Sequence, residues 1–202
     1  MRTLLLVTLL ATACDSSPPP REFDGVSAFK YLEQQVAFGY RIPGTPGHAR
    51  MATWLDSMAR ARADTVIIQS WTHVTARGDT LPLVNVIARF NPRATERVLF
   101  MAHWDTRPHS DAPTFKGDRT QPVTGANDGA SGVALLLGVA DVLRRNPPRV
   151  GVDLLFVDGE DYGTFTPDVD VLLGSTYFAS NLPSANYQPL FGVVWDMVGA
   201  AD

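Results

Sequence analysis

The feature that most constrains this chain is an apolar run that ends abruptly on carboxylates. Residues 150–157 are largely apolar and have the composition of one buried strand. After Asp158 and a glycine come the adjacent acids Glu160 and Asp161. In open α/β sheets the ligand crevice lies beyond the carboxyl ends of the strands, so these two acids are placed for chemistry. One can bind a metal ion while its neighbour keeps a free carboxylate for proton transfer. The simpler alternative is a strand that ends in a solvated acidic turn.

Two further apolar runs end on side chains of the same chemical kind. Residues 98–102 lead into His103 and Asp105, which the alternation of an extended chain places on one side. Imidazole is the commonest metal ligand, and a carboxylate beside it can fix its tautomer. Taken alone, the motif also fits a hydrogen-bonded histidine at a strand end. Residues 191–195 form another apolar strand, and it ends on Asp196.

A glycine-rich segment, residues 125–132, carries one carboxylate, Asp128, in its middle. Glycines and small residues let the backbone approach a partner closely. A helix is predicted to follow over residues 133–145, so Asp128 could be a helix cap. Ser131 is the better candidate for that cap, because it lies directly beside the apolar stripe of the helix. Asp128 is then left for another role.

The remaining periodicity predicts further helices and strands of an α/β domain. The first helix begins after the cap Asp24 and ends at Gly39. Its apolar stripe consists of Val26, Phe29, Leu32 and Val36. The other expected elements are a helix over 48–62, strands over 64–74 and 81–90 joined by a hairpin turn at 77–79, long loops over 106–123 and 163–170, and a short helix over 175–180.

The other histidines are not expected to bind a metal. His48 and His73 lack acidic neighbours at ligand spacing, so structural or surface roles are predicted for both. His109 and Asp111 lie in the long loop and are expected to be solvated.

Composition limits the classes of protein to which the chain can belong. A length of 202 residues allows one domain or slightly more, and 45% apolar with 19% charged residues are values of a globular chain. The net charge is −4 and no basic block occurs, which excludes nucleic acid as an expected partner.

Residues 1–20 are predicted to direct export. A charged start is followed by the short apolar run 4–10, which is typical of a secretory signal and too short to span a bilayer. Small residues precede Cys14, the only cysteine, as at a bacterial lipoprotein cleavage site. Lipidation of Cys14 would tether the chain to a membrane through a Ser/Pro-rich segment that ends at Pro20. An ordinary cleavage near Ala13 is the alternative, and either one predicts a periplasmic or extracellular protein.

Four motifs carry a resemblance to a known family. They are His103-Trp104-Asp105, the segment from Gly125 to Gly132, Glu160-Asp161-Tyr162-Gly163 and Asp196-Met197-Val198-Gly199. Together they resemble the zinc-dependent M28 peptidase superfamily from about Ala28 to the end of the chain. Within it the chain is most similar to the animal-type glutaminyl cyclases found also in bacteria, which convert an N-terminal glutamine to pyroglutamate and release ammonia. The resemblance implies a three-layer αβα sandwich around a mixed sheet.

The resemblance also implies roles for the strand-end residues. Asp128 and Asp161 would bind zinc, and Glu160 would be the general base and acid. Asp196 would hydrogen-bond the reacting group, or bind a second ion as in two-metal relatives. His103 and Asp105 match the family's histidine and its orienting aspartate, which leaves a second zinc open. Peptide or protein N-termini would be the substrates.

Two departures from the family pattern stand out. Asp161 occupies a position where many relatives have glutamate, although the shorter carboxylate can still bind zinc. The family's last zinc ligand is a histidine from the C-terminal part of the domain, and none of the histidines here matches it. We therefore expect residues 21–202 to be the N-terminal portion of the catalytic domain, with the third ligand beyond Asp202. Such a chain should expose a sheet edge, be poorly soluble and lack activity.

Two alternatives to a glutaminyl cyclase remain at this stage. An aminopeptidase of the same superfamily would use the same zinc ligands and Glu160, but a metal-bound water as its nucleophile. A lipid-anchored binding protein that has kept the fold and lost catalysis is the second alternative, suggested by the missing histidine.

Overall fold

The computed structural model describes residues 23–110 and 116–199. The predicted export signal, Cys14 and Asp111 lie outside these residues. In chain order the elements are α1 (Gly25–Ala37), α2 (Pro46–Arg60), β1 (Thr65–Val74), β2 (Thr80–Phe90), β3 (Arg97–His103), α3 (Ala130–Arg145), β4 (Gly151–Val157), β5 (Thr164–Phe165), β6 (Asp168–Val169), α4 (Leu173–Ser180) and β7 (Gly192–Val194).

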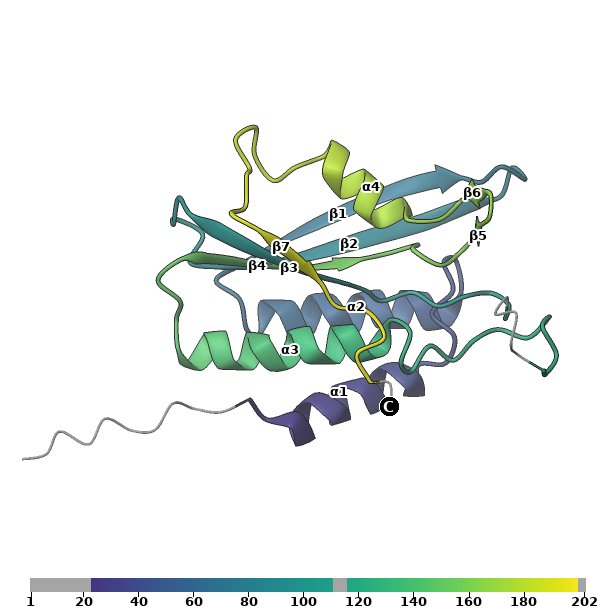
Figure 1. The fold of residues 1–202 in the computed structure, drawn as a ribbon, viewed down its shortest axis with the longest axis horizontal. Helices are drawn as coiled ribbons and strands as arrows, with labels where there is room; N and C mark the ends of the chain where they lie inside the picture. The colour runs from purple at the N-terminus through teal and green to yellow at the C-terminus, as the bar shows by residue number, and fades with distance from the viewer. Residues whose placement is uncertain (1–22, 111–115, 200–202) are drawn as a thin grey trace, which may run out of the picture.

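A mixed five-stranded sheet with the order β1-β2-β4-β3-β7 forms the centre of the fold. β2 is antiparallel to both of its neighbours, β1 and β4, whereas β3 is parallel to both β4 and β7. Helices α1, α2 and α3 lie on one side of this sheet and α4 lies on the other (Figure 1). The predicted αβα sandwich around a mixed sheet is therefore confirmed.

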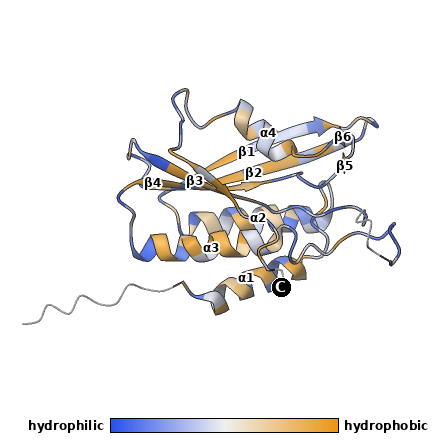
Figure 2. Ribbon diagram, in the orientation of Figure 1, coloured by the Kyte–Doolittle hydropathy of each residue, from blue (hydrophilic) through white to orange (hydrophobic). Residues whose placement is uncertain are grey.

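The central strands are those that the apolar runs predict. Every residue of β4 is buried, including Asp153, because helices cover both of its faces. Strands buried on both faces read as continuous apolar runs, and β3 and β4 are coloured accordingly in Figure 2. The larger core cluster lies between the sheet and helices α2 and α3, and includes Met51, Leu55, Leu136 and Phe156.

The prediction for α1 is correct in its extent and wrong in its buried face. Val26 and Phe29 of the expected stripe are 71% and 60% exposed, whereas Ala28 and Gln35 are buried. α1 packs on α3 at close range, and a Cβ added to Gly138 would lie 3.4 Å from Cβ of Ala28. Small and hydrogen-bonded side chains therefore fill this contact, and hydrophobicity alone does not reveal it.

The opposite face of the sheet has a smaller cluster under α4. It consists of Ile87, Leu155, Val157, Phe178 and Tyr187. β7 lies at one edge of the sheet, where Phe191 and Val194 are 53% and 58% exposed. The expected loop 163–170 contains a small antiparallel ribbon of β5 and β6, which corrects that part of the prediction. Within the described ranges, no helix is both long and apolar enough to cross a bilayer.

Candidate functional site

The register of three parallel strands brings the predicted site residues together. His103 at the end of β3 pairs with Val157 at the end of β4, so Asp158 to Asp161 continue beside Asp105. Met101 pairs with Val194 of β7, which places Asp196 next to His103 two residues later. The pairing of these strands thus brings the residues at their ends into one group, as the sequence predicts.

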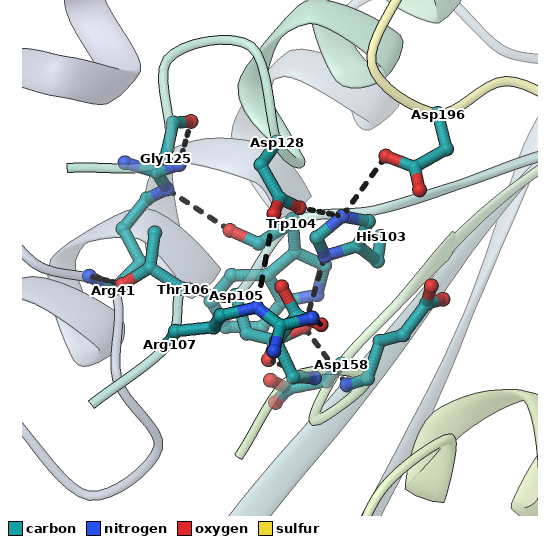
Figure 3. A network of polar contacts seen from close by, with 12 residues as sticks. Arg41, His103, Trp104, Asp105, Thr106, Arg107, Gly125, Asp128, Asp158 and Asp196 are labelled. Carbon is teal, nitrogen blue, oxygen red and sulfur yellow. Dashed lines mark hydrogen bonds and ion pairs between the residues drawn. The ribbon is translucent and has the colours of Figure 1, made fainter. Parts of the chain in front are cut away.

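His103 lies at the centre of this group. Its Nε2 atom is 3.0 Å from Oδ1 of Asp128 and 3.4 Å from Oδ1 of Asp196, while Nδ1 is 3.4 Å from Oδ1 of Asp105 (Figure 3). The ring is buried, yet none of these contacts has hydrogen-bond geometry. Both ring nitrogens therefore face carboxylates without a matched hydrogen bond, which is the condition of a ligand rather than of a satisfied core histidine.

Asp105 holds the backbone of the acidic pair. Its two carboxylate oxygens accept hydrogen bonds from the main-chain N–H groups of Glu160 and Asp161, each at 3.0 Å. Asp105 is fully buried. One side chain at the end of β3 therefore fixes where the segment after β4 turns, and with it the direction of both acids.

Asp128 precedes α3 in a tight turn. Gly129 follows with φ of 87°, and a Cβ there would lie 3.0 Å from both the carbonyl oxygen of Asp105 and Cε1 of His103. Glycine is thus required for this close approach. The prediction that Ser131 caps α3 is wrong: the N-cap position is Gly129, and the Ser131 hydroxyl donates to the carbonyl of Asn127 at 2.6 Å.

Sequence reasoning missed Arg107. Its Nη2 donates to Oδ1 of Asp161 at 2.7 Å, its Nε lies 3.8 Å from Oδ2 of Asp128, and its guanidinium lies over the ring of Phe165. An arginine in a long polar loop gives no signal of this placement, because its partners follow it by 21 and 54 residues.

His48 is structural, as predicted, but it is buried. Its Nε2 lies 2.8 Å from Oδ2 of Asp158, and its ring stacks on Trp104 at 4.5 Å between centroids. Burial raises the pKa of Asp158 to about 6. His73 pairs with Asp170 at 2.7 Å, and His109 is exposed, as expected for a solvated loop residue.

The electrostatics of the site follow from an excess of carboxylates. Burial opposes charge on His103, but Asp105, Asp128 and Asp196 outweigh burial and raise the pKa of the imidazole well above its usual value. Burial raises the pKa of Glu160. Burial also raises the pKa of Asp161. The negative charges of Asp105 and Asp128 raise it further, and the positive charges of His103 and Arg107 offset only part of this rise. Such shifts are common at functional sites.

The residues present fit a zinc ion. Two overlapping groups have ligand atoms that all lie within 4.8 Å of one another: His103 with Asp128 and Asp161, and His103 with Glu160 and Asp196. Oδ2 of Asp161 is buried and has no hydrogen-bond partner. Imidazole with two carboxylates is the type of ligand set that catalytic zinc uses. His103 thus offers a third ligand within the described residues, in addition to Asp128 and Asp161, which the family resemblance implies.

A cavity of about 320 Å³ lies between the turn that joins β1 and β2 and the segment after Asp161. Its lining includes Pro108 and Tyr162, which directly follow Arg107 and Asp161, and the turn between β1 and β2. None of the proposed zinc ligands is among the residues that line this cavity.

An αβα sandwich whose strand ends gather carboxylates around one histidine has the architecture of a metal-binding domain. The family model described as Peptidase family M28 matches residues 85–202. The chain belongs to this family.

Relatives of two activities are similar to the chain. The glutaminyl cyclase of Porphyromonas gingivalis is 40% identical with a TM-score of 0.83, over 88% of this chain and 62% of that one. A Zn-dependent exopeptidase of Parabacteroides distasonis is 37% identical with a TM-score of 0.84, over 90% and 64%. Glutaminyl-peptide cyclotransferase of Bos taurus is 28% identical over 163 residues, which are 74% of this chain and 43% of the relative. The chain thus spans less than half of that relative and under two thirds of both solved structures.

Proposed function

We propose that the protein containing this chain is a zinc-dependent glutaminyl-peptide cyclotransferase. It converts N-terminal glutamine of a peptide or protein to pyroglutamate and releases ammonia. The observation that carries the proposal is the position of Glu160: its partly exposed carboxylate, with a raised pKa, lies in one cluster with His103 and Asp196. The similarity to bacterial glutaminyl cyclases at 36–40% identity supports cyclisation as the reaction.

Glu160 would move the proton in this reaction. As the α-amine nitrogen bonds to the side-chain amide carbon, Glu160 takes one proton from that nitrogen. It delivers the proton to the departing amide nitrogen, which leaves as ammonia when its bond to the same carbon breaks. A carboxylate with a pKa raised toward the working pH suits both transfers.

The other acids would bind and orient. Asp128 and Asp161 would hold zinc with His103 beside them, and zinc would polarise the amide carbonyl of the substrate. Asp196, which is 41% exposed at its side chain, would accept a hydrogen bond from the reacting group. Arg107 keeps Asp161 turned toward Asp128.

A zinc aminopeptidase is the second candidate. The two ligand groups that share His103 favour it, because paired metal ions are the basis of the peptidase mechanism. Relatives described as zinc exopeptidases support it as well. A binding protein without catalysis would keep the fold and show neither activity.

One assay separates these functions. The protein containing this chain, either loaded with zinc or stripped of it by a chelator, is offered a Gln-initiated peptide and a matched Leu-initiated peptide. We expect ammonia release from the first peptide, loss of this activity on stripping and its return with zinc. Cleavage of the second peptide without ammonia from the first would establish the aminopeptidase. Absence of both, with zinc bound, would reject catalysis by this chain.

We also propose that the protein is exported and lipid-anchored through Cys14. Its support is the small-residue segment before Cys14 and the apolar run 4–10. Mass spectrometry of the N-terminal peptide from cells should find acylated Cys14, and Cys14→Ser should abolish it and release the protein from the membrane fraction. An unmodified N-terminus after cleavage near Ala13 would reject the anchor.

A further inference from the structure

Arg41 is a fully buried cation that the proposed chemistry does not use. It lies in the loop between α1 and α2, and its guanidinium partners are main-chain carbonyl oxygens instead of carboxylates. A buried charge is costly unless its hydrogen bonds are satisfied. The placement of these bonds therefore indicates what the residue does.

The three carbonyl groups belong to the two segments that carry the central ligands. Nε donates to the carbonyl of Trp104 at 3.0 Å, between His103 and Asp105. Nη1 donates to the carbonyl of Thr124 at 3.0 Å. Nη2 donates to the carbonyl of Gly125 at 2.7 Å, where the turn to Asp128 begins (Figure 3). One planar group thus joins the end of β3 to the turn before α3.

Arg41 is itself held in place by hydrogen bonds of its main chain and by close contact with Gly125. The main-chain N–H of Arg41 donates to the Thr106 hydroxyl at 2.9 Å, and the N–H of Thr106 donates back to the carbonyl of Arg41 at 3.3 Å. Gly125 has φ of 63°, and a Cβ there would lie 2.9 Å from Nη2 of Arg41. The Gly125 carbonyl also accepts from the N–H of Ala130, so the fork is tied to the start of α3.

The charge of Arg41 also suits this place. Burial lowers the pKa of the guanidinium to about 10, while the negative charges of Asp105 and Asp128 raise it, so the group stays protonated at neutral pH. Arg41 provides a fixed positive charge near the carboxylates of Asp105 and Asp128.

We propose that Arg41 is a positioning residue that sets the separation between His103 and Asp128 and thereby the affinity of the site for zinc. Only the zinc measurement rests on the function proposed above. The positioning of the turn can be measured in the metal-free chain.

Arg97 provides a matched control for a merely structural arginine. It is 6% exposed, lies on the same strand as His103 but at the opposite end, and donates to Asp153 at 2.8 and 2.6 Å. We would compare Arg41→Lys, Arg41→Met and Arg97→Met. Lysine keeps the positive charge but cannot make the three hydrogen bonds of the planar guanidinium group. Arg41→Lys therefore separates the contribution of the charge from that of the hydrogen bonds, and it is the variant expected to remain folded.

The first measurement is amide hydrogen exchange of the metal-free proteins. In Arg41→Lys the amide of Ala130, which closes the turn, should exchange at least about 10-fold faster relative to the amide of Leu154 in β4, because the Gly125 carbonyl loses its second anchor. In Arg97→Met the amide of Leu154, which follows Asp153, should be affected at least as much as that of Ala130, so this ratio should not rise. Equal ratios in the wild type and Arg41→Lys would overturn the positioning role.

The second measurement is metal affinity by chelator competition, with Co²⁺ absorption as a report on ligand geometry. Removal of groups that orient ligands costs about 10- to 100-fold in metal affinity. We expect about 10-fold weaker zinc binding for Arg41→Lys, a loss nearer 100-fold for Arg41→Met if it folds, and wild-type affinity for Arg97→Met. Wild-type affinity and an unchanged Co²⁺ spectrum in Arg41→Lys would overturn the inference. A wild-type chain that binds no zinc would instead reject the zinc site, and the exchange ratio alone would then decide the role of Arg41.

Discussion

The two ends of the parallel strands β3 and β4 handle buried charge in opposite ways. At the amino end, Asp153 is fully buried and bonded to two cations, with Arg89 at 3.1 Å and Arg97 at 2.6 and 2.8 Å. At the carboxyl end, Asp105, Asp128, Glu160, Asp161 and Asp196 surround His103, with Arg107 on one side. The same pair of strands thus carries one carboxylate fully paired with cations and one cluster with an excess of carboxylates.

This difference distinguishes charges that stabilise the fold from charges kept for function. A buried carboxylate that has all its partners contributes to one native state and is costly to disturb. A cluster with excess carboxylates is costly to keep, and its raised pKa values show this cost. A cation that enters the carboxyl end would remove the excess, so the comparison itself favours a metal site there.

The largest expected effect belongs to Glu160→Gln at the carboxyl end. The amide keeps the shape of the side chain but cannot accept a proton, so turnover should fall by about 10²- to 10⁴-fold. Zinc content should remain that of the wild type, because Glu160 is not among the proposed ligands. Steady-state kinetics with metal analysis measures both, and wild-type turnover would remove Glu160 from its role.

At the amino end the expected effect is on stability instead. Asp153→Asn leaves Arg89 and Arg97 without their counter-charge, and breaking such a buried pair costs about 3–5 kcal/mol. Urea unfolding should show this loss, with zinc affinity of the folded protein unchanged. A weaker zinc site in this variant would contradict the independence of the two ends, since they would then be coupled.

The third prediction concerns the pH dependence of zinc binding. The pKa of Asp161 is raised, so part of the metal-free chain carries a proton there near neutral pH. This proton and the proton of His103, whose pKa is also raised, must leave before the two side chains can bind zinc. Affinity should therefore rise with pH, by at most about 100-fold per unit for two protons, and level off above both pKa values. Calorimetry in two buffers of different ionisation enthalpy should detect the released protons. A pH-independent affinity would contradict the assignment of Asp161.

The smallest effect is expected for Asp161→Asn. Because folding raises the pKa of Asp161, the fold disfavours its charged form, and the neutral amide should stabilise the metal-free protein at pH 7 by about 1 kcal/mol. Zinc binding should be lost at the same time. Thermal unfolding in chelator measures the first effect. Destabilisation comparable to that of Asp153→Asn would show that Asp161 is a structural residue.

The sequence predicts the strand-end residues well, because strands have a strong local signal. Apolar runs identify β3, β4 and β7, and the parallel register then brings His103, Glu160 and Asp196 together. The mixed sheet, the hairpin of β1 and β2 and the extent of α2 follow from patterns within a few residues.

Residues that act through distant partners could not be predicted. Arg41 stands in a loop rich in proline and glycine, and its partners are backbone carbonyls more than 60 residues away. His48 and Asp158 are 110 residues apart, so spacing gave no indication of their pairing. The cap of α3 is Gly129 instead of Ser131, because the close approach to His103 decides that turn and local capping preference does not.

The side chain of Trp104 turns away from the site and gives the molecule an optical reporter. Of four tryptophans it is the fully buried one; its indole N–H donates to the carbonyl of Val84 at 3.1 Å and its ring stacks on His48. Its own carbonyl accepts from Arg41, and its neighbours in the chain are His103 and Asp105. The contribution of this indole to the fluorescence of the protein therefore reports on the strand end without any label, since a shift of β3 or a change in the His48 ring alters its surroundings directly.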